Sequence, residues 1–468
     1  MTPNGSAIRV GLLPLYVALY DESVPFLRPI VEAYYAEAAD ALTKKGLDVM
    51  RVPVCRLKDE FAEAIRAFEA AGVDCIISLH LAYSPSLESA EVVAATKLPL
   101  IVLDSTEAFR FSHPDEILAN HGIHGVMDFC NLLRRYKKDY AIAAGHLSEE
   151  GLVDRVVELA KSAVAAGALK GMRVASIGGS FAGMGDFVVT DEELAAFGIE
   201  VVRPAEGALA ACRAAVTDAE IQAEMAADLA EGVRLPGDYG NFSPEIHARS
   251  TRDSLALRRW LNEEKIDAFS VNFPMVDKTG LRTMPFMETC RAMARGLGYA
   301  GEGDILTAAF CGALRRGFTS TTFVEPFCPD WSDNRILLSH MGEVNYGCID
   351  GPIELTEFEF VYGTAENPVV GFAHMRAGEA VYINIYNDGD GFNMLLSPVT
   401  MQHPAGEDAF AGKIRGWMRP KMPLGRFLEG LSAVGATHHS ILVYDTTVDA
   451  LAYFGRLCGL KTSILSIS

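Results

Sequence analysis

The sequence is poor in basic residues relative to acidic ones. Lysine and arginine total 41 against 61 aspartates and glutamates, which gives a formal net charge of −20. Such a charge repels the phosphates of nucleic acids and the surfaces of anionic membranes, so we expect neither as a partner. It is compatible with neutral or cationic ligands, including a cation held by carboxylates.

Long apolar runs and CxxC pairs are also missing. No segment approaches the ~20 uninterrupted apolar residues that span a bilayer, and the first residues lack the basic and apolar regions of a signal peptide. The nine cysteines are odd in number and lie mostly in apolar runs. We therefore expect a cytoplasmic protein with buried free thiols.

What is present is a hydrophobic chain long enough for several domains. Half of the 468 residues are hydrophobic, and this length corresponds to about three domains. Through the first half, apolar runs of strand length alternate with amphipathic helices, a rhythm typical of parallel sheets covered by helices. In the last third, short strands separated by turns predominate; they are expected at 319–324, 335–338, 358–361, 369–372, 380–386, 392–398 and 440–444.

The predicted fold class is therefore α/β. We expect two consecutive Rossmann-like parallel-sheet domains, residues 1–165 and 166–318, and then a C-terminal β-rich, barrel-like domain, residues 319–468. The last domain carries most of the metal-ligand candidates described next.

Two glutamates stand where expected elements end. Glu302 lies between two glycines just before a helical run, and Asp304 takes the position of a helix N-cap. Glu302 has no such structural role, so its carboxylate projects from a tight turn. Glu325 ends the strand expected at 319–324. Taken alone, a glutamate at a strand end is more often a solvated edge residue than a ligand.

Two histidine positions also lie at element ends. His340 follows the strand expected at 335–338, and His438 and His439 precede the strand at 440–444. His340 is open to a structural reading as a core histidine bonded to a backbone carbonyl. His438 and His439 are adjacent and point in different directions, so we expect at most one of them to reach a shared centre. Taken together, two glutamates and two histidines supply oxygen and imidazole donors without thiolate. This set suits octahedral Mn²⁺, or Mg²⁺ and Co²⁺, better than structural zinc.

The segment that contains Glu302 resembles a known family. Residues 298–304, running into Thr307-Ala308-Ala309, are similar to the GYGFxGEGDWKTAA segment of the bacterial L-arabinose isomerases. Residues 323–325 resemble the family's S-F-M-E-D-Y, residues 339–344 its H-M-L-E-V, and residues 435–439 its G-G-A/T-H-H. Weaker similarities at residues 79–85, 124–129, 145–146, 184–191 and 268–273 keep the same order along the chain.

This resemblance implies a set of site residues. Glu302, Glu325, His340 and His439 correspond to the ligands of a divalent metal, most often Mn²⁺, and the two glutamates to the groups that transfer protons. His438 corresponds to a neighbour of the metal ligands. The sugar-pocket positions correspond to Tyr83, His124, Met184, Phe273 and Met341. In this family the N-terminal pocket residues come from a neighbouring subunit, which implies a homo-oligomer, a trimer or hexamer, with active sites between subunits.

Three pocket positions depart from the family pattern. Leu13 replaces a sugar-binding glutamine, His121 stands where a second glutamine is found, and Phe327 stands where a tyrosine follows the second glutamate. A hydroxyl that faces an apolar group loses a hydrogen-bond partner. We therefore expect a pentose, hexose or modified hexose other than L-arabinose. An alternative is that Leu13 points into the core and another residue, such as Asn120, makes the contact.

The resulting hypothesis is a metal-dependent aldose–ketose isomerase that acts on an open-chain sugar through an enediol. A non-catalytic sugar-binding protein with a cleft between two α/β domains is the alternative from another class. Such a protein has no need for the set of two glutamates and two histidines.

Overall fold

The computed structural model describes residues 7–466 except residues 231–242, 405, 407 and 411. The chain forms two compact units, Met1–Gly167 with Asp449–Gly459 and Ala168–Val448 with Leu460–Ser468. The second unit contains both the second sheet and the β-rich region. The division into three domains, with boundaries at residues 165 and 318, stays a prediction.

The first unit is a parallel sheet with helices on both faces. Its strands are β1 (Arg9–Leu15), β2 (Asp48–Arg51), β3 (Cys75–His80), β4 (Leu100–Asp104) and β5 (Ala141–Ala144), in the order β2-β1-β3-β4-β5. The helices are α1 (Leu19–Ser23), α2 (Leu27–Lys44), α3 (Lys58–Ala71), α4 (Ser86–Ala95), α5 (Gly122–Arg135), α6 (Leu152–Gly167) and α14 (Val448–Leu457).

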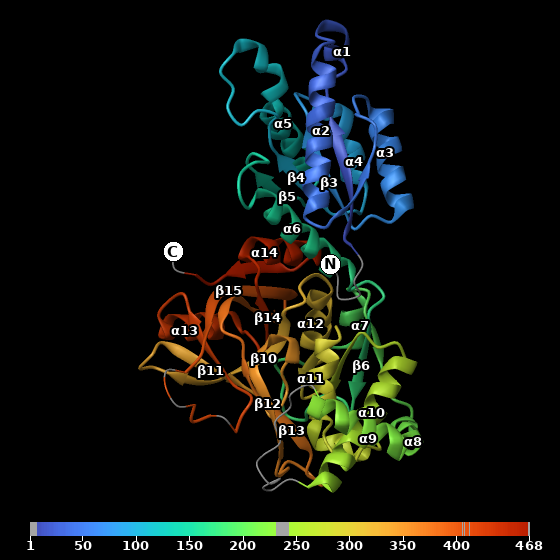
Figure 1. Cartoon of the computed structure of the whole chain (residues 1–468), viewed down its shortest axis with the longest axis vertical. Coiled ribbons are helices and arrows are strands. Elements are labelled where there is room, and N and C mark those ends of the chain that lie inside the picture. The colour runs from blue at the N-terminus through green and yellow to red at the C-terminus, as the bar shows by residue number, and fades with distance from the viewer. Residues whose placement is uncertain (1–6, 231–242, 405, 407, 411, 467–468) are drawn as a thin grey trace. The chain divides into compact units, whose positions relative to one another are not determined.

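Alternation along β1 explains the two cores of this unit, whose helices and strands are drawn in Figure 1. Val10 and Leu12 belong to one buried cluster, with residues of α2 and α6, whereas Leu13 and Leu15 belong to another, with residues of α3, α4 and α5. Successive side chains of a strand point to opposite faces of its sheet. The sheet is therefore buried on both sides, as the apolar runs predict.

The second unit begins with another parallel sheet, ordered β7-β6-β8-β9. Its strands are β6 (Arg173–Ile177), β7 (Glu200–Val202), β8 (Ala268–Val271) and β9 (Gly298–Gly301). Its helices are α7 (Asp191–Ala195), α8 (Ala208–Ala215), α9 (Asp218–Ala230), α10 (Pro244–Glu263), α11 (Phe286–Ala294) and α12 (Ile305–Gly317).

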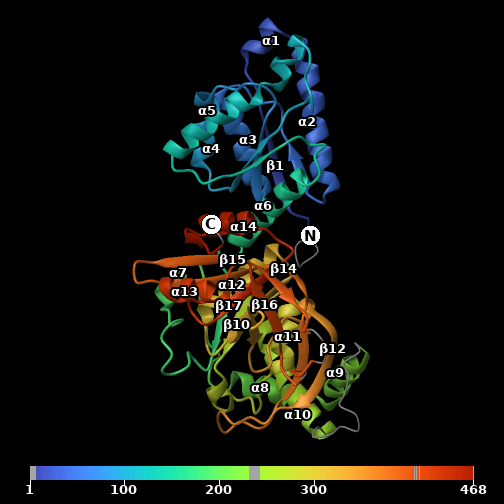
Figure 2. The same cartoon turned by 90° about the vertical axis from the view of Figure 1, so that its left-hand side faces the viewer.

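The β-rich region is a closed antiparallel barrel of six strands. The ring runs β14-β17-β10-β11-β16-β15 and closes through the pairing of β15 with β14. The bounds are β10 (Thr321–Asp330), β11 (Arg335–Ser339), β14 (Gly378–Asn387), β15 (Phe392–Gln402), β16 (Gly416–Pro420) and β17 (Ser440–Tyr444). Strand β18 (Lys461–Ile464) pairs in parallel with β15, and α13 (Leu424–Val434) precedes β17. Helix α12 contacts β10, β14 and β17 (Figure 2).

The strand expected at 358–361 is wrong. The chain forms β12 (Ile349–Glu357) just before it, paired with β13 (Val369–Met375), and residues 358–361 are irregular. Their aromatic rings pack on neighbouring rings instead: Phe358 lies on Phe286, and Phe360 lies on Phe273. The β-propensity of these residues indicates a strand, but their rings pack on neighbouring aromatic rings and the segment stays irregular.

The predicted fold class is confirmed. The described chain contains parallel-sheet regions followed by a C-terminal barrel. None of the described helices is long and apolar enough to cross a membrane. The cysteines are free thiols and most are buried, as expected.

Candidate metal and active site

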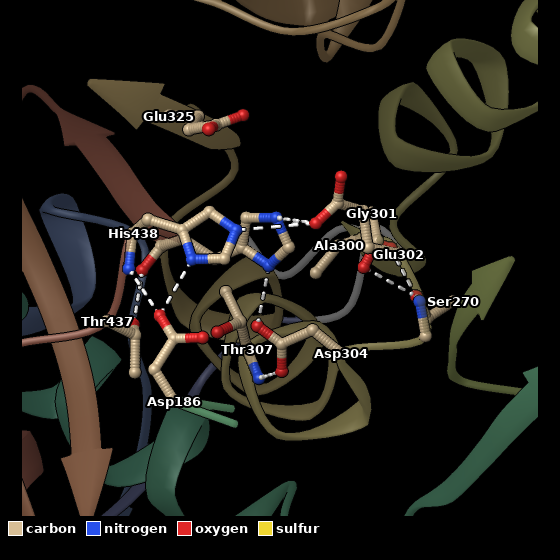
Figure 3. Close-up of polar contacts among 12 residues, drawn as sticks. Asp186, Ser270, Ala300, Gly301, Glu302, Asp304, Thr307, Glu325, Thr437 and His438 are labelled. Carbon is tan, nitrogen blue, oxygen red and sulfur yellow. Dashed lines mark hydrogen bonds and ion pairs between the residues drawn. The ribbon is translucent and has the colours of Figure 1, made fainter. Parts of the chain in front are cut away.

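Glu302 is held in a strained turn between β9 and α12. Its backbone has a φ of 61°, in the left-handed region that non-glycine residues rarely adopt. Gly303 follows with a φ of 82°, and a Cβ there would lie 2.1 Å from the carbonyl oxygen of Gly179. The Ser270 hydroxyl accepts the Gly303 N–H at 2.9 Å and donates to the Ala300 carbonyl at 2.6 Å (Figure 3). Such strain, fixed by surrounding contacts, is typical of functional sites.

Strand register brings the other candidates together at one end of the barrel. Glu325 on β10 is the register partner of Ser339, and His340 follows Ser339 directly. Val324 pairs with Ser440 on β17, and His439 precedes Ser440. The Nε2 atom of His340 lies 3.6 Å from Oε2 of Glu325, and that of His439 lies 3.6 Å from Oε2 of Glu302.

Each histidine of the site has a carboxylate on its Nδ1 atom. His340 contacts Glu343 at 2.6 Å, His439 contacts Asp304 at 3.0 Å, and His438 contacts Asp186 at 2.7 Å. A carboxylate on one ring nitrogen fixes the hydrogen there and leaves Nε2 with a free lone pair toward the centre. Asp304 also caps α12 by accepting the Thr307 N–H at 2.8 Å, so the predicted N-cap is confirmed.

These residues fit a divalent cation. The ligand atoms of Glu302, His438 and His439 lie within 4.8 Å of one another, as do those of Glu325, His340 and His439. The expectation that only one of His438 and His439 reaches the centre is therefore wrong. The Nε2 atom of His439 is buried and has no hydrogen-bond partner among the described residues. A buried polar atom without a partner is costly. A cation bound between the carboxylates and imidazoles removes that cost.

The electrostatics of the two glutamates differ. Burial favours the protonated form of Glu302, but the hydrogen bond with His438 and the nearby imidazoles lower its pKa below the ordinary value. Burial prevails at Glu325 and raises its pKa. Burial also acts to lower the pKa of His340, but Glu343, Glu325 and Glu302 raise it to about 9. The centre therefore attracts positive charge.

The pocket residues predicted in the second unit differ in how deeply they are buried. Phe273 is buried beside Phe181, with ring centroids 5.4 Å apart, and Met184 and Met341 are half-buried. Phe327 is 53% exposed, at an irregularity of the β10–β11 register between Pro326 and Cys328. A bulge re-aims the side chain of its strand.

Three predicted pocket residues of the first unit lie together. His124 Nδ1 and His121 Nε2 are 3.0 Å apart, and the Tyr83 ring lies 5.1 Å from that of His124 and 6.1 Å from that of His121. The expectation for Leu13 is wrong, because its side chain is fully buried in the core cluster with α3, α4 and α5. The amide of Asn120 is also engaged, with the Ala108 N–H and the Glu116 carbonyl.

The sequence did not identify the carboxylates behind the histidines. Glu343 had a signal, because it follows His340 by three residues. Asp186 had none, since it lies in a loop 252 residues from His438.

Two family models match the chain. The L-arabinose isomerase central domain matches residues 173–317, and the L-arabinose isomerase C-terminal domain matches residues 320–461. The chain is an L-arabinose isomerase-like protein. This family placement makes it an enzyme, an intramolecular oxidoreductase of the aldose–ketose isomerase class. The alternative of a sugar-binding protein without catalysis is set aside.

Curated relatives agree with this placement. The L-arabinose isomerase of Erwinia tasmaniensis is 24% identical over 460 residues, 93% of this chain and 90% of its own. That of Nocardioides sp. is 26% identical over 431 residues, 86% of this chain and 83% of its own. That of Oceanobacillus iheyensis is 26% identical over 369 residues, 74% of each chain.

Proposed function

We propose that the protein is a divalent-metal-dependent isomerase that interconverts an aldose and a ketose. Glu302, Glu325, His340 and His439 would hold the ion, for which Mn²⁺ is the first candidate and Co²⁺ and Mg²⁺ are alternatives. The observation that carries this proposal is the buried Nε2 atom of His439, which has no hydrogen-bond partner among the described residues and lies 3.6 Å from Oε2 of Glu302.

The two glutamates would move the protons. In the aldose-to-ketose direction, Glu302 takes the proton from C2 while Glu325 gives one to the aldehyde oxygen, which forms the enediol. Glu325 then takes the proton from O2 while Glu302 gives its proton to C1, which yields the ketose and returns both glutamates to their starting states. Positioned general acid–base groups of this kind contribute roughly 10²–10⁴-fold. The ion, when bound, supplies Lewis acidity and a template for the two reacting oxygens.

The substrate proposed is a sugar that differs from L-arabinose in its distal part. With Leu13 in the core, the support comes from His121 and Phe327, which replace a glutamine and a tyrosine of the resembling family. The exposed side chain of Phe327 would offer the sugar an apolar contact in place of a tyrosine hydroxyl. A deoxy or otherwise modified hexose therefore belongs among the first substrates to test, together with simple pentoses.

A homo-oligomer, trimer or hexamer, is part of the proposal. The metal-site residues belong to the second unit, and Tyr83, His121 and His124 belong to the first. The first unit also exposes large apolar side chains, Phe109 at 70%, Met127 at 67% and Phe111 at 59%. Burial of these side chains against a neighbouring subunit, whose site Tyr83, His121 and His124 would complete, fits the arrangement that the resemblance implies. The cytoplasm is the proposed location.

The test is a panel of aldoses and ketoses on metal-stripped protein reloaded with Mn²⁺. L-Arabinose, D-galactose, L-fucose and a modified hexose are followed for conversion between aldose and ketose. Conversion of at least one sugar supports the proposal. Failure of the reloaded protein to convert any aldose or ketose tested contradicts it.

A further inference from the structure

The loop between β6 and α7 contacts Glu302 at its main chain. The Phe181 N–H donates to the Glu302 carbonyl at 2.9 Å, and the backbone of Gly179 and Ser180 lies directly against Gly303. The loop also carries Met184, one of the predicted pocket residues. It therefore runs beside the turn that projects the Glu302 carboxylate.

The same loop reaches the Glu302 side chain through a histidine. Oδ2 of Asp186 accepts the His438 backbone N–H at 3.0 Å and contacts His438 Nδ1 at 2.7 Å. On the opposite side of the ring, His438 Nε2 lies 3.3 Å from Oε2 of Glu302 (Figure 3). Two contacts with one carboxylate oxygen fix both the main chain and the ring of His438. This series of contacts ends at the Glu302 carboxylate, which we propose takes the proton from C2 of the sugar.

Phe187 fixes the register of this loop. Its side chain is 1% exposed, and its ring stacks on that of His439 with centroids 5.0 Å apart and planes 13° from parallel. It also lies 5.5 Å from the ring of His438. With Phe187 locked in this way, the preceding residue has little freedom to leave His438.

We propose that Asp186 is a positioning residue for the isomerase reaction, which holds Glu302 in its reactive orientation by fixing the ring of His438. This inference rests on the proposed role of Glu302. The carboxylates behind the other two histidines, Asp304 and Glu343, are buried with their own elements. Asp186 alone belongs to a loop that also carries a predicted pocket residue, so it connects the sugar side of the site with the proton-transfer group.

Replacement of Asp186 separates this role from metal binding. Loss of an outer partner of a site histidine costs roughly 10–100-fold in metal affinity or activity. If His438 acts by orienting Glu302, Asp186→Ala lowers kcat in that range and leaves KM for the sugar nearly unchanged. The affinity for Mn²⁺ falls by less than kcat, because Glu325, His340 and His439 still hold the ion. Asp186→Asn keeps a carbonyl oxygen in the same place, so most of the lost kcat returns.

The measurements are kcat, KM and calorimetric Mn²⁺ binding to the metal-stripped full chain. The matched control is Asp191→Asn, which removes a carboxylate that pairs with Arg203 further along the same segment; we expect it to behave as the wild type. Should Asp186→Ala fail to fold, Asp186→Ser, too short to reach His438, is held to the same criteria.

Three results would overturn the inference. They are a wild-type kcat in Asp186→Ala, a loss of Mn²⁺ affinity as large as the loss of kcat, and no recovery in Asp186→Asn. Glu302→Gln is measured in parallel. If Glu302→Gln keeps its activity, the role proposed for Glu302 fails; if Glu302→Gln is inactive and Asp186→Ala is not impaired, only the role of Asp186 fails.

Discussion

Gly301 lies against the imidazole of His340 so closely that a Cβ at this position would be 2.8 Å from Cε1 of the ring. The ring has little room to move, since Glu343 contacts its Nδ1 at 2.6 Å and the Phe323 ring lies 5.4 Å from it. The absence of a side chain at residue 301 is therefore a condition for the placement of a proposed metal ligand.

Gly301→Ala should displace His340 and weaken metal binding. We expect a loss in Mn²⁺ affinity of about 10-fold or more, and overpacking of the site should lower the free energy of unfolding by about 1–3 kcal/mol. Calorimetric titration and urea denaturation measure the two effects. The control is Gly425→Ala in α13, where a Cβ meets no atom of the residues that the structure describes within 4 Å beyond its own helix and neighbours. Unchanged Mn²⁺ affinity in Gly301→Ala would show that His340 is not a ligand or that its ring moves freely.

Glu302→Gln and Glu325→Gln should each lower kcat by at least about 10²-fold, because each removes a proton-transfer group. Glu302 lies in the turn before α12, and Glu325 lies within β10 but faces the site rather than an apolar core. The melting temperature of the metal-stripped chain should therefore change little. Glu354→Gln, an exposed position on β12, is the control and should keep its activity. A glutamine variant with near-wild-type kcat and bound metal would remove its glutamate from the proposed mechanism.

His80 should make the protein less stable in acid. It is 2% exposed, neither ring nitrogen has a partner among the described residues, and burial lowers its pKa to about 3. The unfolded chain binds a proton near pH 6.5, where the folded chain does not. Stability is therefore full above this pH and falls as the pH drops toward 3.

Between pH 7 and pH 5 this one group should cost about 2 kcal/mol of the free energy of unfolding. Urea denaturation of the wild type and His80→Gln at both pH values measures it. Whatever the stability of the variant at pH 7, its loss of the free energy of unfolding between the two pH values should be smaller than that of the wild type by this amount. Equal losses in the two proteins would mean that His80 takes up a proton in the folded state.

L-Arabinose should not be the best substrate of the panel. His121 and Phe327 replace two polar contacts of the resembling family, and a sugar hydroxyl without a partner costs on the order of 1–3 kcal/mol. The comparison is kcat/KM for L-arabinose, D-galactose, L-fucose and a modified hexose. If L-arabinose has the highest value, the substrate argument is wrong and the pocket accepts the family's sugar.

Much of the fold followed from hydrophobic periodicity, because strands buried on both faces read as continuous apolar runs. β9 was not predicted, since its sequence, Gly298–Gly301, offers small residues whose packing against α12 only the structure shows. The strand at 358–361 failed because its aromatic rings pack on Phe273 and Phe286 rather than into a sheet.

The metal-site candidates were recognisable because local patterns placed Glu302, Glu325, His340 and His439 at the ends of expected elements. For Glu325 that expectation is wrong, because β10 continues to Asp330. Their proximity depends on the register of β10 with β11 and β17, which no local pattern specifies. Asp186 illustrates the limit, because its contact with His438 depends on the tertiary fold. Leu13 illustrates a second limit. Its match to a pocket position of the resembling family did not tell to which face of β1 its side chain points, and the structure places it in a core cluster.

The most direct test of the account is a metal titration of the stripped chain in which activity and binding are followed together. We expect no turnover in excess EDTA, and a rise of activity with Mn²⁺ or Co²⁺ that follows the filling of one tight site per chain, a site absent from the double variant Glu302→Gln, His439→Gln. Full activity in excess EDTA, or tight Mn²⁺ binding that survives in the double variant, would contradict it.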